Sequence, residues 1–157
     1  MRPTDLVLAV VLSAAPVAAE DDDRRARDTS AALRATPGWK LYAAECGTCH
    51  LAFPPELLPV RSWKKLLGGL ADHFGQNAEI DAPTLTGLTR FLEQQGGADV
   101  GGVPLRITTL PSWRREHREI PTATFARKAI VSPANCAACH PGAELGDFDE
   151  EQVVIPK

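Results

Sequence analysis

The chain contains two Cys-x-x-Cys-His motifs, at residues 46–50 and 136–140, which together use all four of its cysteines. This spacing is typical of covalent c-type haem attachment. The two thiols of a motif form thioether bonds to the vinyl groups of a porphyrin, and the histidine that follows lies beneath the ring as an iron ligand. We therefore predict two covalently attached haem c groups. The predicted attachment residues are Cys46, Cys49, His50, Cys136, Cys139 and His140.

Two other uses of paired cysteines fit the sequence less well. Four cysteines could bind one zinc ion, but the two pairs lie far apart along the chain. Zinc also does not require a histidine directly after each pair. Disulfides would suit an exported protein, but a disulfide that closes a Cys-x-x-Cys ring is strained and usually catalytic. Haem attachment accounts for both histidines.

The other iron ligands are predicted by counting side chains. Besides His50 and His140, the chain has only two histidines, His73 and His117, and its one methionine is Met1. A methionine sixth ligand is therefore lacking, and four histidines suit two irons with two imidazoles each. Such ligation lowers the reduction potential relative to His/Met ligation. We expect His50 to pair with His73 and His117 with His140, although crossed pairing also fits the sequence.

Helix signals surround the first motif. Thr36, followed by a proline, has the pattern of an N-cap and predicts a helix over residues 37–46 that leads into the motif. Ser62 is expected to cap a second helix, with His73 close to its apolar stripe. Asp81 is expected to begin a third helix. A core histidine held by hydrogen bonds is the alternative role for His73.

The second half has weaker signals. Residues 96–103 contain four glycines and predict a linker between two haem domains. Residues 106–110 are expected to be extended at most. Ser112 should cap a short helix that places His117 on the same face as a tryptophan, although the charged neighbours of His117 also suit an exposed histidine. Ser132 should begin a further helix that leads into the second motif.

The N-terminus indicates export. Residues 1–19 have the layout of a cleaved secretory signal peptide, with an apolar run at 6–15 and small residues before Glu20. That run is shorter than the ~20 residues needed to span a bilayer, so we expect no stable membrane insertion after cleavage. Residues 20–35 are predicted to be a flexible acidic and basic leader. Because haem c is attached outside the cytoplasm, a periplasmic location is expected.

Composition and ligation point to an electron carrier and not to an enzyme. The formal net charge of −3 does not support a nucleic-acid surface, and no catalytic constellation competes with the haem motifs. Two imidazoles saturate an iron, which argues against catalysis at the metal. The alternative is a haem-based gas-binding or reductase protein with one labile distal histidine, for which His117 is the best candidate.

The sequence also resembles the small bacterial dihaem cytochromes c of the Rhodobacter type. The resemblance includes the segments around both distal histidines as well as the two motifs. A nitrate-reductase electron-entry subunit would also have two bis-histidine haems, but these segments look less like that family. The matching segments are residues 45–50, 53–55, 58–59, 62–63, 70–75, 116–120 and 135–140.

This resemblance implies a mainly α fold. It implies a class I cytochrome c-like N-terminal haem domain, here residues 36–95, and a small, largely irregular C-terminal haem domain, here residues 104–157. It further implies bis-histidine ligation at both irons. The implied role is electron transfer between a membrane cytochrome b, as donor, and a monohaem c-type protein, as acceptor.

Overall fold

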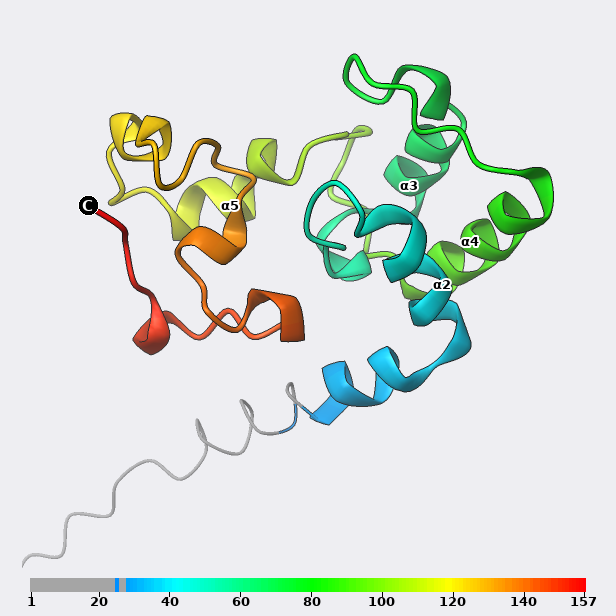
Figure 1. Ribbon diagram of the computed structural model, residues 1–157, viewed down its shortest axis with the longest axis horizontal. Coiled ribbons are helices and arrows are strands. Elements are labelled where there is room, and N and C mark those ends of the chain that lie inside the picture. Colours follow the sequence, from blue (N-terminus) through cyan, green and yellow to red (C-terminus); the bar gives the residue numbers. More distant parts are fainter. Residues whose placement is uncertain (1–24, 26–27) are drawn as a thin grey trace, which may run out of the picture.

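The computed structural model describes Arg25 and residues 28–157. The predicted signal peptide, residues 1–19, lies outside this part of the chain. The described residues form α-helices, short 3-10 helices and loops, with two isolated β-bridges and no sheet (Figure 1). The predicted mainly α class is confirmed. None of the helices within residues 28–157 has the length and hydropathy needed to cross a bilayer.

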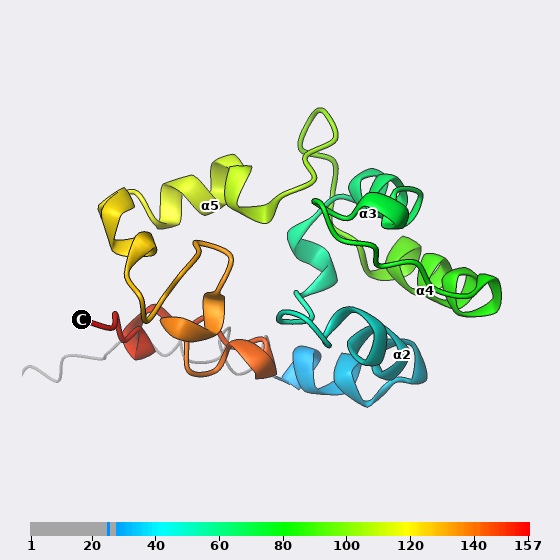
Figure 2. The same cartoon turned by 45° about the horizontal axis from the view of Figure 1, so that its top comes forward.

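Three helices form the core of the N-terminal half. They are α2 (Pro37–Cys46), α3 (Val60–Leu67) and α4 (Ala82–Gln95), and α4 packs against both of the others (Figures 1 and 2). Aromatic rings fill the space between them and meet mainly edge to face, the favoured geometry for such pairs. The buried side chains at this centre are Trp39, Tyr42, Trp63, Leu88, Phe91 and Leu92.

Two of the predicted helix starts are confirmed. The hydroxyl of Thr36 accepts a hydrogen bond from the backbone N–H of Trp39 at 3.2 Å and caps α2. The carboxylate of Asp81 accepts from the N–H of Thr84 at 3.1 Å and caps α4. Each cap satisfies a backbone donor that has no partner inside the helix.

The predicted cap at Ser62 is wrong. Helix α3 begins at Val60, after Pro59, and Ser62 lies inside the helix with its backbone N–H donating to the carbonyl of Pro59 at 2.9 Å. The side chain of Ser62 is fully buried, and its hydroxyl has no hydrogen-bond partner among the described residues. The extended backbone of the proline starts the helix three residues earlier than the serine pattern suggested.

The C-terminal half has one short α-helix, α5 (Pro111–Glu116), which begins at Pro111 and not after a cap at Ser112. No helix begins at Ser132, because its hydroxyl accepts from the N–H of Ala134 and closes a local turn. The expected extended segment 106–110 instead contains a 3-10 turn. The short 3-10 helices of the chain are η1 (Pro55–Leu57), η2 (Leu70–Asp72), η3 (Ile107–Thr109), η4 (Thr122–Ala126), η5 (Cys136–Ala138), η6 (Ala143–Leu145) and η7 (Glu150–Gln152).

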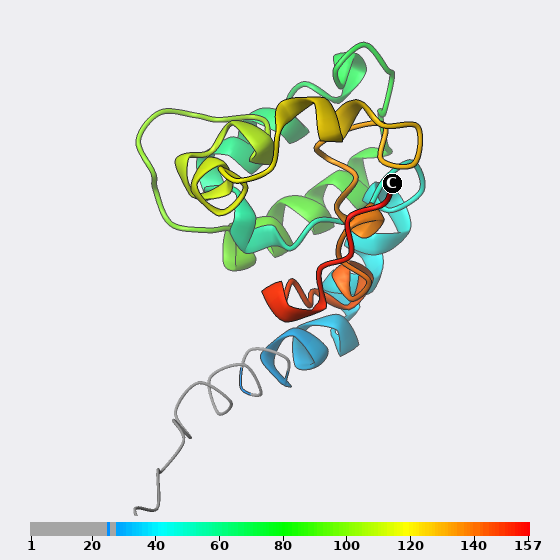
Figure 3. The same cartoon turned by 90° about the vertical axis from the view of Figure 1, so that its left-hand side faces the viewer.

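Contacts join the two halves, among them the guanidinium of Arg106, which lies 3.9 Å from the ring centre of Phe74. Leu110 is buried in the same hydrophobic cluster as the centre of the N-terminal half. Residues 28–35, part of the expected flexible leader, are helical and run beside the C-terminal half (Figure 3). There the hydroxyl of Ser30 donates to the carbonyl of Leu145 at 3.0 Å. The domain boundary at residues 96–103 therefore stays a prediction.

Candidate functional site

The four histidines lie in two pairs. The ring centres of His50 and His73 are 6.2 Å apart, with an angle of 25° between the ring planes. The ring centres of His117 and His140 are also 6.2 Å apart, with an angle of 67°. Each motif histidine therefore lies near the distal histidine of its own half, which is the local pairing expected from the sequence.

Both separations fit two imidazoles that bind one iron from opposite sides. The ring centres of such a pair lie about 6 Å apart, because each metal–nitrogen bond is about 2 Å long and each ring centre lies about 1 Å behind its nitrogen. Two independent pairs with the same separation match this value. The residues present are therefore suited to hold two haem irons.

The first motif histidine is oriented by the loop that follows α2. Nδ1 of His50 donates to the carbonyl of Leu51 at 2.8 Å, which leaves Nε2 available for a metal. The His50 ring stacks on Phe53 at 5.1 Å between ring centres. The buried hydroxyl of Tyr42 donates to the carbonyl of Phe53 at 2.8 Å, so the loop that carries His50 is fastened to the helical core.

His73 lies on a tight two-residue turn and not on the apolar stripe of a helix, since α3 already ends at Leu67. His73 and Gln76 exchange two backbone hydrogen bonds of 2.7 Å and 3.2 Å. The two residues between them, Phe74 and Gly75, have φ values of 55° and 92°. A type I′ turn requires positive φ at both central positions. This turn fixes the backbone from which the His73 side chain projects.

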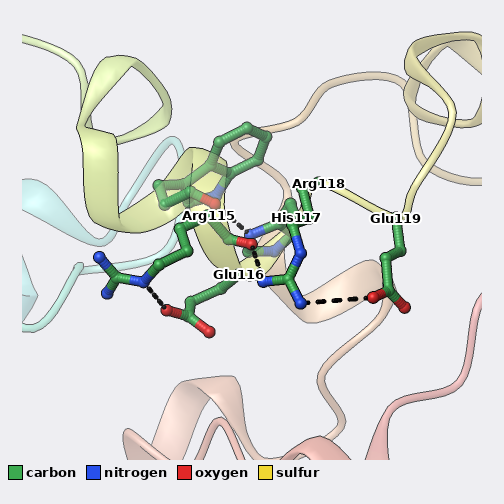
Figure 4. A network of polar contacts seen from close by, with 6 residues as sticks. Arg115, Glu116, His117, Arg118 and Glu119 are labelled. Carbon is green, nitrogen blue, oxygen red and sulfur yellow. Dashed lines mark hydrogen bonds and ion pairs between the residues drawn. The ribbon is translucent and has the colours of Figure 1, made fainter.

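His117 is the residue directly after α5. Its Nδ1 donates to the carbonyl of Trp113 at 2.9 Å, and its ring stacks on the indole at 4.2 Å with a 12° angle between the planes. The charged neighbours form ion pairs with one another, Arg115 with Glu116 and Arg118 with Glu119, around a half-buried His117 (Figure 4). His117 is therefore not the fully exposed histidine that its neighbours made possible.

His140 follows the turn η5. Its backbone N–H donates to the carbonyl of Cys136 at 2.8 Å. The C-terminal tail is attached to the same motif, because the N–H of Val154 donates to the carbonyl of Cys139 at 2.9 Å. Phe148 contacts the ring edge to face at 5.4 Å. Nδ1 of His140 is buried and has no hydrogen-bond partner among the described residues.

Two of the imidazoles, one in each pair, are biased towards the neutral form. Burial lowers the pKa of His73, and the nearby His50 and Arg106 lower it further. Burial also lowers the pKa of His140, with a smaller contribution from His117. Because only a deprotonated imidazole nitrogen binds a metal, this bias favours ligation at neutral pH.

The thiols do not have the character of a redox dithiol. Burial, with a contribution from the carboxylate of Glu45, raises the pKa of Cys46 to about 11. Burial also raises the pKa of Cys136 and of Cys139. A catalytic Cys-x-x-Cys pair instead has one thiol with a lowered pKa. All four cysteines are free. Among the described residues, no three Cys, His, Asp or Glu side chains lie together in a group suited to a metal ion. The zinc alternative therefore has no support.

Comparison with known proteins agrees with this geometry. The family model described as dihaem cytochrome c matches residues 42–148. The chain belongs to the dihaem cytochrome c family. It therefore carries two haem c groups and has the electron-transfer role that this family implies. No curated protein matches the chain.

Solved structures give the same result. A diheme cytochrome type c from Shewanella baltica is 36% identical, covers 77% of this chain and 95% of its own length, and superposes with a TM-score of 0.70. A protein purified from Rhodobacter sphaeroides as DHC is 42% identical, covering 69% of this chain and 96% of its own, with a TM-score of 0.62. A diheme cytochrome c from Rhodobacter sphaeroides is 36% identical, with coverages of 69% and 95% and a TM-score of 0.63.

Two aromatic side chains near the ligand pairs, Phe125 and Phe148, were not identified from the sequence. Phe125 lies 5.6 Å from Trp113, and Phe148 lies beside His140. Neither has a spacing from a histidine that indicates contact, because the 3-10 helix η4 carries Phe125 and a loop carries Phe148. Only Trp113 had a signal, its position four residues before His117.

The type I′ turn yields a testable prediction. Replacing Gly75 by valine places a β-branched residue at φ 92°, in a region that costs about 1–2 kcal/mol for an L-residue. We expect the strain to displace His73 and to reduce the six-coordinate, low-spin fraction of one haem. Optical spectra of the ferric and ferrous protein measure this fraction.

Gly101→Val is the matched control. Gly101 also has a positive φ, of 78°, and both glycines are surrounded by open space. The N–H of Gly101 donates to the carboxylate of Asp99, just as the N–H of Gly75 donates to that of Asp72. It lies in the 96–103 segment and not beside a histidine. Equal spectral changes in the two variants would show that the His73 turn has no particular role in ligation.

Proposed function

We propose that this dihaem cytochrome c is a low-potential electron carrier. In this proposal His50 and His73 bind one iron, and His117 and His140 bind the other. The observation that supports it most strongly is the separation of 6.2 Å between ring centres in both pairs. A haem c with two imidazole ligands exchanges one electron with little change in its coordination geometry.

The chain supplies attachment and orientation for this role. Cys46 and Cys49 would bind one haem, and Cys136 and Cys139 the other, so retention of the cofactor does not depend on a large apolar pocket. Backbone carbonyls accept from Nδ1 of His50 and His117. Such hydrogen bonds fix the ring orientation and make the imidazole a stronger electron donor to the metal.

The low potential follows from the ligand types. The thioether of methionine as an axial ligand raises the potential of a haem relative to imidazole. The one methionine of the chain is Met1, in the predicted signal peptide. Two imidazoles at each iron would therefore favour the ferric state in both halves.

Substitution of the distal histidines tests the ligand assignment. We expect His73→Met and His117→Met each to raise the midpoint potential of one haem by at least about 60 mV, a tenfold change in a one-electron equilibrium constant. The other midpoint should stay in place. A spectroelectrochemical titration that resolves the two haems measures both values.

Arg115→Met is the control for these variants, because it introduces a methionine two residues from His117 at an exposed position and removes no proposed ligand. The proposal fails if both histidine variants leave the two potentials unchanged, or if the unsubstituted protein titrates at potentials typical of His/Met cytochromes.

Carbon monoxide distinguishes a carrier from a gas-binding protein or reductase. If imidazoles occupy both axial positions of both irons, the reduced protein should show no change in its visible spectrum under carbon monoxide. A rapid change in about half of the haem absorption would instead indicate that one of the two irons has an open or labile position. Repeating the measurement on His117→Ala provides the positive control, because that variant should bind the gas at one haem.

We further propose that the protein works in the periplasm between a membrane cytochrome b and a monohaem c-type protein. The signal-like residues 1–19 and the need to attach haem c outside the cytoplasm support the location. In a Gram-negative host, the mature chain should be found in the periplasmic fraction and begin at Glu20. Stopped-flow mixing should show reduction by membranes that contain a reduced cytochrome b, and oxidation by a monohaem cytochrome c of higher potential. A cytoplasmic, uncleaved chain would contradict the location, and the absence of either reaction would contradict that partner.

A further inference from the structure

The two histidine pairs have the same separation but different twist. The ring planes of His50 and His73 are 25° from parallel, whereas those of His117 and His140 make an angle of 67°. The first pair is close to parallel and the second is closer to perpendicular. The two pairs therefore differ in the angle between their ring planes and not in the separation of their ring centres.

Trp113 contacts the His117 ring in two ways. The indole lies 12° from parallel with the imidazole at 4.2 Å, and the carbonyl of the same residue accepts from Nδ1 of His117. Trp113 is itself held, since it packs against the main hydrophobic cluster and against Phe125. One residue therefore constrains the His117 ring through both its side chain and its backbone.

The opposite ring has a different set of contacts. Phe148 meets His140 edge to face with a 65° angle between the planes, and Nδ1 of His140 has no hydrogen-bond partner among the described residues. In the first pair, His50 has both a hydrogen bond to Leu51 and a near-parallel neighbour, Phe53, at 28°. The two halves thus orient their rings by different means.

The twist between two axial imidazoles has an electronic consequence. Each imidazole interacts most strongly with the iron d orbital that overlaps the p orbital perpendicular to its ring plane. Two parallel rings act on the same d orbital and separate it in energy from its partner. Two perpendicular rings act on both d orbitals and leave them close in energy. The orientation of the axial ligands is one of the means by which a protein tunes a haem.

We propose that Trp113 is a positioning residue that holds the His117 ring across that of His140 and so gives the C-terminal haem an electronic structure unlike that of the N-terminal haem. This inference rests on the ligand pairs proposed above. The near-parallel N-terminal pair gives well separated d orbitals, and the twisted C-terminal pair gives nearly degenerate ones.

Electron paramagnetic resonance of the ferric holoprotein tests the proposal. We expect two low-spin signals, one rhombic with three resolved g values, and one strongly anisotropic with a larger maximum g value. His73→Met assigns them, because it should remove the rhombic bis-histidine signal and leave the anisotropic one. Two rhombic signals of similar g values would overturn the inference. A high-spin signal in the unsubstituted protein would instead contradict the ligand pairs of the proposed function, so the two failures are distinguishable.

Substitutions of Trp113 test the positioning role. Trp113→Leu removes the stacked ring and should shift the maximum g value of the anisotropic signal towards that of the rhombic one. Trp113→Phe keeps an aromatic face and should leave the signal near its original position. Phe53→Leu, which removes the ring stacked on His50, is the matched control and should alter the rhombic signal alone. Pyridine haemochrome analysis checks that each variant keeps two haems. An unchanged anisotropic signal in Trp113→Leu would show that the indole does not set the ring orientation.

Discussion

The proposed function depends on one constraint, which is that two imidazole rings lie with their centres 6.2 Å apart, once in each half of the chain. The tolerance is small, because a metal–ligand bond is lost when its length changes by a fraction of an ångström. The two halves meet the requirement with different local structures. His73 is held by a two-residue turn with positive φ at both central positions. His117 is held by the end of a six-residue helix and a stacked indole.

The N-terminal half has an apolar core of its own, and the C-terminal half has much less of one. The buried hydrophobic residues beyond position 100 are only Leu110, Ile130 and Ala143 among those described. Leu110 belongs to the cluster of the other half. Leu145 and Val154 are 71% and 64% exposed. A half with so little buried surface has little hydrophobic stabilisation, so covalent attachment is a suitable way for it to retain a haem.

The success of the local sequence signals depended on how each polar side chain is packed. The side chains of Thr36 and Asp81 cap the helices that follow them, as expected. Ser62 and Ser132 were also expected to cap helices, but Ser62 is buried within α3, its hydroxyl without a partner among the described residues, and Ser132 closes a local turn. Serine can bond its own or nearby backbone in several ways, and packing decides which of them occurs. The prediction that His73 lies beside the apolar stripe of a helix was also wrong. The helix α3 ends at Leu67, although the apolar pattern in the sequence continues beyond it.

The sequence by itself determined the chemistry of this protein. The two Cys-x-x-Cys-His motifs specify covalent haem attachment, and the count of histidines and methionines makes imidazole the expected sixth ligand, because both inferences depend on residue type and near-neighbour spacing alone. The tertiary structure decided which histidines lie opposite each other and how their rings are turned. Those properties come from contacts that loops create, such as Phe53 with His50 and Phe148 with His140. The contact of Trp113 with His117 follows from their spacing of four residues along α5 and its end. No periodicity in the sequence encodes the two loop contacts, since loop geometry is set by the packing of the whole chain.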